Sequence, residues 1–308
     1  EEAGTPRRRG AAPKARETKA KDGGRAPVVT ATRGGKARLK AGGAPRPARA
    51  PRSAPGADAF YVDPAHAREF GRRLRAWYRR NARDLPWRRT RDPYHVLVSE
   101  LMLQQTQVSR VVDYYARFLT RFPTLRHVAE ADPQHVTAEW AGLGYYARAR
   151  NLHALARQLH AEGGTGMLPP TPEALRTLPG IGAYTAGAVA SFAFERRAAL
   201  VDTNVARVLA RVFAPGTDVK SGRGQKVVWR IAEAILPRRG AEVWTHNQAL
   251  MELGALVCTA RVRRCTGCPV KAVCLTHEAT GCPEDAQASF ADTPAFLKIT
   301  RRKRTENG

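Results

Sequence analysis

The sequence predicts an all-α fold between about residue 60 and residue 277. Apolar residues recur at helical spacing through this part of the chain, and no convincing run of alternating polar and apolar residues occurs between turn signals. Several stretches open with an aspartate or a threonine followed by proline, which is a typical helix start. About ten helices are expected from this pattern.

The helix starts follow one another along the chain. They lie at Asp63-Pro64, Asp92-Pro93, Asp132-Pro133 and Thr171-Pro172. Apolar stripes predict two further helices over about residues 108–119 and 152–159, the second ending at Gly163-Gly164. The aromatic and aliphatic side chains of these stripes are the predicted core: Phe70, Leu74, Trp77, Tyr78, Tyr94, Leu97, Leu101, Val108, Val111, Val112, Tyr115, Phe118, Leu119, Val136, Trp140, Leu152, Leu155, Ala156 and Leu159.

The chain is strongly basic. Its 308 residues include 52 Lys and Arg against 27 Asp and Glu, a net charge of +25, which indicates a polyanionic partner and argues against a typical metabolic enzyme. Residues 1–56 are basic, rich in Pro and Gly and free of aromatic residues, so we expect a disordered basic arm. A solvating tail without a specific role is the alternative. The rest of the chain is also basic, so the nucleic-acid inference does not depend on the arm.

No membrane segment is expected, because the sequence has no run of 18 apolar residues. The basic N-terminus is not followed by an apolar segment, so a signal peptide is not expected either. The first residue is Glu rather than Met, which points to processing or truncation there. We expect a monomer in the cytoplasm, associated with the nucleoid.

A glycine-containing turn lies between two helical stretches, where residues 178–182 read Leu-Pro-Gly-Ile-Gly. Two glycines leave backbone N–H groups uncovered at a helix N-terminus, which can bind phosphate. An ordinary Gly-rich connector is the alternative, and the positive charge favours phosphate binding. The segment resembles a helix-hairpin-helix motif. That resemblance implies DNA phosphate contacts at Gly180 and Gly182, and a monovalent cation held by the hairpin carbonyls.

All five cysteines lie between residues 258 and 282. Cys258, Cys265, Cys268 and Cys274 have the spacing C-x6-C-x2-C-x5-C, and Cys282 lies outside this pattern. Disulfides are not expected in an intracellular chain that binds nucleic acid. Zinc is an alternative, but zinc sites usually pair two C-x2-C knuckles. One compact loop of four thiolates favours a 4Fe-4S cluster, and the spacing resembles the cluster loop of the endonuclease III superfamily.

Two carboxyl residues adjoin apolar stretches. Glu100 lies within an apolar helix, where a raised pKa would keep it protonated, and Asp202 follows an apolar run and precedes a helix. One protonated acid and one carboxylate suit the cleavage of a bond between a base and its sugar. The alternatives are a helix-surface residue for Glu100 and a plain N-cap for Asp202, and local sequence alone favours the cap.

Several motifs, in the right order, resemble MutY-type adenine DNA glycosylases of the endonuclease III (helix-hairpin-helix) superfamily. The resemblance covers about residues 65–277, some two thirds of the chain. Asp202 lies about twenty residues beyond the hairpin, as in that superfamily. The motifs are Leu-Pro-Trp-Arg at 85–88, Glu-Leu-Met-Leu-Gln-Gln-Thr-Gln at 100–107, Gly-Leu-Gly-Tyr-Tyr-Ala-Arg-Ala-Arg-Asn at 142–151 and Asn-Gln-Ala-Leu-Met-Glu-Leu-Gly at 247–254.

The resemblance implies a role for each matching residue. Glu100 would protonate adenine N7, Asp202 would stabilise the oxocarbenium ion, and Tyr184 and Asn204 would orient this pair. Tyr184 stands where endonuclease III itself has a lysine, and tyrosine forms no Schiff base, so strong lyase activity is not expected. The implied pocket for a flipped adenine comprises Arg83, Trp87, Arg88, Leu103, Gln248 and Met251. The residues implied to enter the base stack are Gln105, Thr106 and Tyr145.

The implied architecture has two lobes. A six-helix barrel over residues 88–197 would carry the hairpin, residues 57–87 and 198–282 would form the iron–sulfur lobe, and residues 283–308 would be a short tail. The implied function is base excision repair of double-stranded DNA, with adenine removed from mispairs with 8-oxoguanine or guanine. Because only 34 residues follow Cys274, we expect no second domain that reads 8-oxoguanine and a weakened preference for it.

Two alternatives differ from this function. One is a thymine or uracil mismatch glycosylase of the same superfamily, against which Gln104-Gln105-Thr106 argues. The other is a non-catalytic iron–sulfur DNA-binding protein, which would need neither Glu100 nor Asp202.

Overall fold

The computed structural model describes residues 60–161 and 166–281. This part of the chain contains twelve α-helices and two 3-10 helices, with no β-strand among the described residues and an isolated bridge between Cys258 and Arg263. The predicted all-α fold is therefore confirmed. The basic arm over 1–56, the tail over 283–308 and the helix stop at Gly163-Gly164 lie outside the described residues.

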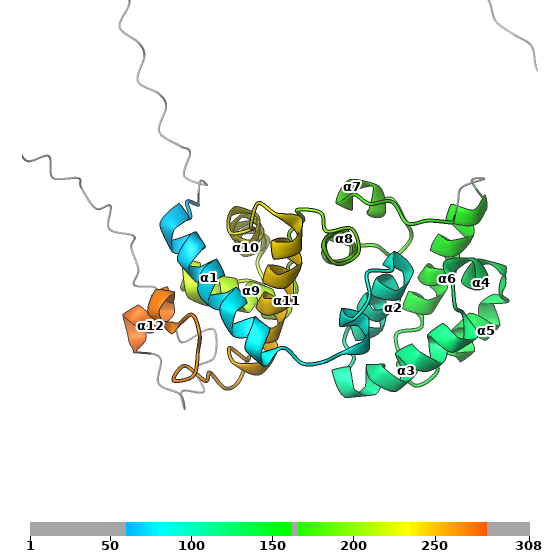
Figure 1. Cartoon of the computed structure of the whole chain (residues 1–308), viewed down its shortest axis with the longest axis horizontal. Coiled ribbons are helices and arrows are strands. Elements are labelled where there is room, and N and C mark those ends of the chain that lie inside the picture. The colour runs from blue at the N-terminus through cyan, green and yellow to red at the C-terminus, as the bar shows by residue number, and fades with distance from the viewer. Residues whose placement is uncertain (1–59, 162–165, 282–308) are drawn as a thin grey trace, which may run out of the picture. The chain divides into compact units, whose positions relative to one another are not determined.

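One group of helices combines the start of the described chain with its end (Figure 1). Helix α1 packs on α11, and α9 contacts α10, α11 and α12. The group consists of α1 (Pro64–Asn81), α9 (Thr203–Phe213), α10 (Gly222–Ala234), α11 (Gly240–Leu256), η2 (Lys271–Val273) and α12 (Leu275–Thr280). Segments more than a hundred residues apart in sequence thus share one packing unit.

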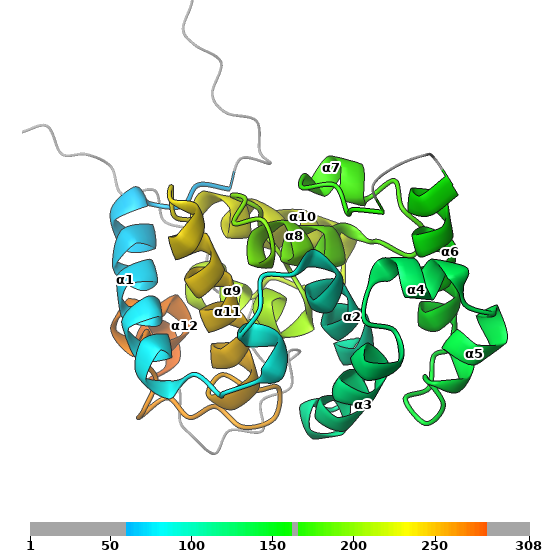
Figure 2. The ribbon, with the colours of Figure 1, turned by 45° about the vertical axis from the view of Figure 1, so that its right-hand side comes forward.

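The intervening helices form a second group. Helix α2 contacts α3, α6 and α8, and α6 packs on α4 and α5 (Figure 2). This group consists of η1 (Pro86–Arg88), α2 (Pro93–Leu103), α3 (Val108–Arg121), α4 (Leu125–Glu130), α5 (Pro133–Ala138), α6 (Ala147–Ala161), α7 (Pro172–Leu175) and α8 (Ala183–Phe192). Contacts between α8 and α11 join the two groups.

The predicted helix starts are confirmed by their cap hydrogen bonds. The Asp63 carboxylate accepts from the Ala65 amide at 2.9 Å, and Asp92 accepts from the Tyr94 amide at 2.8 Å. Asp132 and Thr171 cap α5 and α7 in the same way. Each side chain satisfies an N–H that the helix leaves unpaired, which stabilises a helix by about 1 kcal/mol.

Most of the predicted core is buried, and the half-buried members are Trp77, Val108, Val112, Leu119 and Leu159. Two helices are buried almost all round, since most residues of α2 and all residues of α8 from Thr185 onward are excluded from solvent. Helices without a polar face belong in the interior of a protein. A polar side chain on either helix is therefore held in an apolar environment. Within the described ranges, no helix is long and apolar enough to span a membrane.

Candidate active site

One cavity is lined by residues from several of the sequence motifs. It comprises about 1970 Å³, including space open to solvent, and residues of α2, α8, α9 and α11 line it. The predicted site residues along its wall are Arg83, Trp87, Arg88, Glu100, Leu103, Gln105, Thr106, Gly180, Gly182, Tyr184, Asp202, Asn204, Gln248 and Met251. Tyr145 is predicted to contact the base stack but does not line this cavity.

Glu100 is a buried acid with one direct hydrogen bond. Its side chain projects from α2, the residue is 3% exposed, and the Tyr184 hydroxyl donates to Glu100 Oε2 at 2.8 Å. Burial raises the pKa of Glu100 to about 7, and the nearby Asp202 charge adds to this, while the Tyr184 hydrogen bond and the Arg88 charge partly offset it. Glu100 can thus carry a proton near neutral pH. The helix-surface alternative for Glu100 is wrong.

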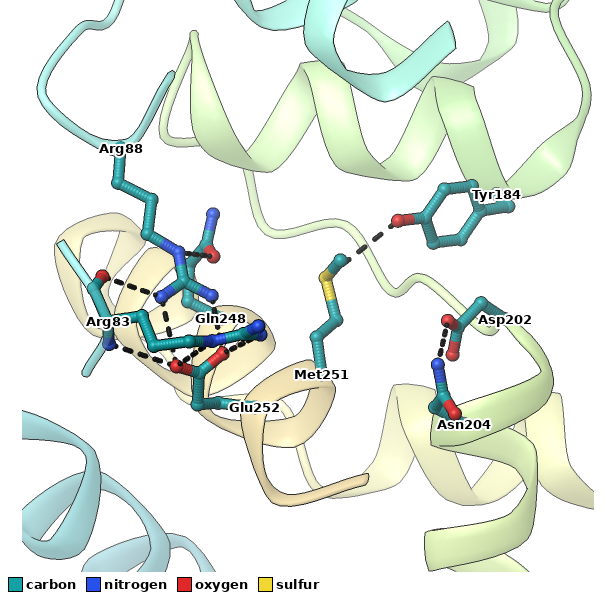
Figure 3. A network of polar contacts seen from close by, with 8 residues as sticks. All are labelled: Arg83, Arg88, Tyr184, Asp202, Asn204, Gln248, Met251 and Glu252. Carbon is teal, nitrogen blue, oxygen red and sulfur yellow. Dashed lines mark hydrogen bonds and ion pairs between the residues drawn. The ribbon is translucent and has the colours of Figure 1, made fainter. Parts of the chain in front are cut away.

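Tyr184 lies in the first turn of α8, between α2 and α11. Besides its bond to Glu100, its hydroxyl lies 3.8 Å from Met251 Sδ (Figure 3). Burial raises the pKa of Tyr184 well above its ordinary value, and the charges of Glu100 and Asp202 add to the shift. The tyrosine therefore remains a hydrogen-bond donor toward Glu100 and is not a nucleophile at neutral pH.

Asp202 is the N-cap of α9 and also faces the cavity. Its Oδ1 accepts from the Val205 amide at 2.6 Å, and its Oδ2 accepts from Asn204 Nδ2 at 3.1 Å (Figure 3). The cap that local sequence favours and the cavity position that the family resemblance implies are therefore both present in one side chain. Two donors fix the orientation of the carboxylate.

A hydrogen-bonded chain leads from Asn204 to the cysteine loop through Arg207. Arg207 Nη2 donates to Asn204 Oδ1 at 2.8 Å and to the Gly254 carbonyl at 2.8 Å, and its Nε donates to the Cys258 carbonyl at 3.0 Å. A Cβ at Gly254 would lie 2.8 Å from Asn204 Cβ, so this close approach favours glycine. Sequence reasoning missed Arg207, whose buried position was not evident from its spacing.

An ion-paired network forms another wall of the cavity (Figure 3). Glu252 is completely buried and accepts from Arg83 Nη2 at 2.8 Å and from Arg88 Nη2 at 2.8 Å. Arg88 Nε also donates to Gln248 Oε1 at 3.0 Å. Burial opposes the charge on Glu252, but the hydrogen bonds from Arg83 and Arg88 outweigh it and lower its pKa to about 2. Sequence reasoning identified the two arginines and Gln248 but missed Glu252, although it lies in the motif at 247–254.

The two hairpin glycines have different local environments. Gly180 has φ +74°, and a Cβ there would lie 2.6 Å from Asn151 Cβ, so both backbone and packing require glycine. Gly182 is the N-cap of α8, has no side-chain cap and would have open space around a Cβ. The first amides of α8 are therefore left without a side-chain cap beside the cavity.

Gln105 and Tyr145 lie in two turns with strained backbone. Their φ angles are +56° and +49°, a region that residues with a side chain rarely occupy. Gln105 is exposed at the cavity, and Tyr145 is 61% exposed beyond it. Such strain is often found at sites of function.

The four predicted metal ligands line a second pocket, whose empty space of about 450 Å³ includes space open to solvent. Cys258, Cys265, Cys268 and Cys274 line it and form no disulfide, and Arg211 Nη1 lies 3.3 Å from Cys258 Sγ. Among the residues for which side chains are described, no group of three or more His, Cys, Asp or Glu is placed to hold a single metal ion. The four cysteines nevertheless border one shared pocket.

A protein-family model and curated proteins match large parts of this chain. Residues 98–233 match the family model described as HhH-GPD superfamily base excision DNA repair protein. The adenine DNA glycosylase of Rattus norvegicus is 45% identical over 232 residues, which are 72% of this chain and 44% of that protein. The chain thus spans less than half the length of this relative.

Two solved structures share the fold. A thermostable thymine-DNA glycosylase is 30% identical with a TM-score of 0.64, and the alignment covers 70% of this chain and 98% of that one. Endonuclease III, in a trapped covalent intermediate with DNA, is 22% identical with a TM-score of 0.59, covering 71% and 99%. The helices described above therefore have the endonuclease III fold, and the chain belongs to the HhH-GPD superfamily of base excision DNA repair proteins.

Proposed function

We propose that this chain is an adenine-specific mismatch DNA glycosylase, acting on double-stranded DNA in which adenine faces guanine or 8-oxoguanine. The observation that carries the proposal is Glu100, a buried acid with a pKa of about 7 that shares one cavity with Asp202. The similarity of this chain to adenine DNA glycosylases, such as the relative that is 45% identical, supports adenine as the base.

The proposed reaction divides the work between two carboxyl groups. Glu100 donates its proton to N7 of adenine as the glycosidic bond breaks and its electron pair leaves with the base. Asp202, held by Val205 and Asn204, stabilises the positive charge that develops on the sugar. Water then adds to the sugar C1′ and gives up a proton to a carboxylate, which leaves an abasic site in an uncut strand. Tyr184 keeps Glu100 in place and provides no amine for strand cleavage.

The network of Arg83, Arg88, Gln248 and Glu252 gives the cavity a polar wall that suits a flipped base. A base that leaves the duplex must be bound by hydrogen bonds and by apolar or aromatic faces, which the pocket combines. In this proposal the apolar part of the pocket comes from Trp87, Leu103 and Met251. Gln105, Thr106 and Tyr145 fill the gap that the base leaves in the stack.

We further propose that Cys258, Cys265, Cys268 and Cys274 hold a 4Fe-4S cluster. All four cysteines line one pocket, and the single compact loop that carries them, with its one C-x2-C pair, favours a cluster over zinc. A bound cluster would cross-link the loop over 258–274 through its metal–thiolate bonds. The backbone at Gly180 and Gly182 would bind DNA phosphate, together with a monovalent cation at the hairpin.

The proposed organisation follows the same family. Residues 88–197 would form the six-helix barrel, residues 57–87 and 198–282 the cluster lobe, and the contacts of α8 with α11 support a site between them. The protein would act as a monomer in the cytoplasm, at the nucleoid.

The test is a glycosylase assay on duplexes with A:G, A:8-oxoguanine and G:T mispairs, each read with and without alkali. We expect adenine excision that becomes a strand break only after alkali. Glu100→Gln should bind these duplexes but excise nothing, because the amide keeps the shape and loses the transferable proton. Excision of thymine instead of adenine would favour the thymine glycosylase alternative. The G:T duplex is included because a solved thymine-DNA glycosylase is 30% identical to this chain.

A further inference from the structure

Arg148 is a buried arginine in the first turn of α6. It is 6% exposed, and its guanidinium donates to backbone carbonyls and to the Thr106 hydroxyl. None of the ion pairs within the described residues involves Arg148. A buried charge is costly unless it is hydrogen-bonded, so this set of carbonyls is what makes the position tenable.

The first set of contacts lies at the end of α2. Arg148 Nη1 donates to the carbonyls of Leu101 at 2.7 Å, Met102 at 2.9 Å and Gln104 at 2.7 Å. The last carbonyls of a helix have no partner within the helix, and they form its negative end. Arg148 therefore acts as a C-terminal cap for the helix that carries Glu100.

The second set of contacts joins two turns. Nη1 and Nη2 each lie 3.4 Å from Thr106 Oγ1, in the turn that carries Gln105. Nη2 also donates to the Gly144 carbonyl at 2.9 Å, and Nε donates to the Tyr145 carbonyl at 3.4 Å. One guanidinium thus bridges the two turns whose residues Gln105 and Tyr145 have left-handed backbone. Both conformations cost energy and persist only where surrounding contacts enforce them.

Two aromatic rings flank the same group. The Arg148 guanidinium carbon lies 5.5 Å from the centre of the Trp140 ring and 5.6 Å from that of Tyr145, distances at which a cation is attracted to a ring. Lysine has a single ammonium with three donors, whereas arginine has a planar fork with five. A lysine at this position would keep the charge but would not hold both turns and the helix end together.

We propose that Arg148 is a positioning residue that fixes the turns of Gln105 and Tyr145 relative to Glu100, so that an extruded base arrives at the acid while the gap in the stack is filled. This inference rests on the proposed function, since it assigns Arg148 a part in base extrusion rather than in bond cleavage. Arg148 touches neither the base nor the sugar in this scheme.

The test compares Arg148→Lys with Arg157→Lys, an exposed arginine on the same helix. Single-turnover excision is measured for adenine opposite guanine and for adenine opposite an abasic-site analogue, where the base is already unpaired. We expect Arg148→Lys to lose about 100-fold on the mispair, the effect of misplacing a reacting group by about 1 Å. The loss should be much smaller on the unpaired adenine, and Arg157→Lys should match the wild type on both duplexes.

An equal loss on both duplexes would show a merely structural role and overturn the inference, as would wild-type rates for Arg148→Lys. If Arg148→Lys does not fold, Thr106→Val removes one hydrogen-bond acceptor of Arg148. Its excision rate should then fall more on the mispair than on the unpaired adenine, by less than in Arg148→Lys. A loss of rate that does not depend on the duplex overturns the inference. If the wild type excises no adenine, the proposed function fails separately. Hydrogen exchange then decides the positioning role, since Arg148→Lys should speed exchange at residues 103–107 and 142–147, and unchanged exchange would refute it.

Discussion

The acidity of Glu100 makes the proposed reaction sensitive to pH close to neutrality. With a pKa of about 7, about nine tenths of the Glu100 carboxyls carry a proton at about pH 6 and about one tenth at about pH 8. Single-turnover excision should therefore slow roughly tenfold over this interval if the proton on Glu100 is the one transferred. A glutamate with its ordinary pKa of 4.5 would be protonated only about 0.3% of the time at about pH 7, some two orders of magnitude less.

The hydrogen bond from Tyr184 allows the assignment to be tested further. This bond favours the charged form of Glu100, so Tyr184→Phe should raise the pKa of Glu100 and move the fall in rate to higher pH. Tyr94→Phe is the matched control, because Tyr94 lies on the same helix but donates to the Phe122 carbonyl at 2.7 Å. Single-turnover rates with saturating enzyme, measured from about pH 4 to about pH 9, give both profiles.

A rate that stays constant between about pH 6 and about pH 8 would refute the reasoning, because Glu100 would then not be the acid with a pKa of about 7. A fall centred near the ordinary value of 4.5 would show that burial does not raise the pKa. An equal shift in Tyr94→Phe and Tyr184→Phe would mean that the two variants act through α2 as a whole instead of through the bond to Glu100.

Three other predictions concern the metal, the strand and the ion-paired network. The purified protein should contain about four irons. Cys268→Ser should lower the iron content, whereas Cys282→Ser, at a position outside the described residues, should leave it unchanged. Zinc without sulfide in the purified protein would contradict the cluster. Borohydride should not trap the wild type on DNA, since Tyr184 provides no amine, and efficient trapping would disprove this. Glu252→Gln should cost about 3–5 kcal/mol of unfolding free energy by leaving Arg83 and Arg88 without their shared carboxylate. The control Glu69→Gln, in a solvent-exposed pair, should cost far less, and equal costs in thermal unfolding would contradict the argument.

The contribution of Glu252 should also depend on pH. Because the pKa of Glu252 is lowered to about 2 from 4.5, its stabilising effect is present above about pH 4.5 and is lost as the pH falls toward 2. Acid denaturation of the wild type and Glu252→Gln should therefore converge at the acid end.

Local signals in the sequence predicted much of the fold. Aspartate or threonine before proline marked four helix starts, each confirmed by a side-chain cap. These signals are reliable because the physics of a cap involves only neighbouring residues. The buried positions of Leu74, Leu97 and Leu152 followed from helical spacing, which reports which face of a helix is apolar.

Long-range polar contacts were not predictable in the same way. Arg148 and Arg207 are buried, whereas Arg150 and Arg157, on the same helix as Arg148, are exposed. What distinguishes them is burial against carbonyls from remote segments, such as Leu101 and Cys258. The structural role of Glu252 likewise depends on its ion pair with Arg83, which lies 169 positions away in the sequence. The roles that resemblance implied for Glu100 and Asp202 could be stated from motifs, but the raised pKa of Glu100 depends on helices that close around it.

The cap at the start of α9 limits which residues this position can tolerate. One oxygen of Asp202 completes the fold by binding the Val205 amide, and the other faces Asn204 and the cavity. Asparagine serves as well as aspartate at an N-cap, so Asp202→Asn retains the helix start while it removes the negative charge. Loss of the charge can thus arise without loss of the helix start, so such a variant would keep its fold while the cavity loses the negative charge at this position.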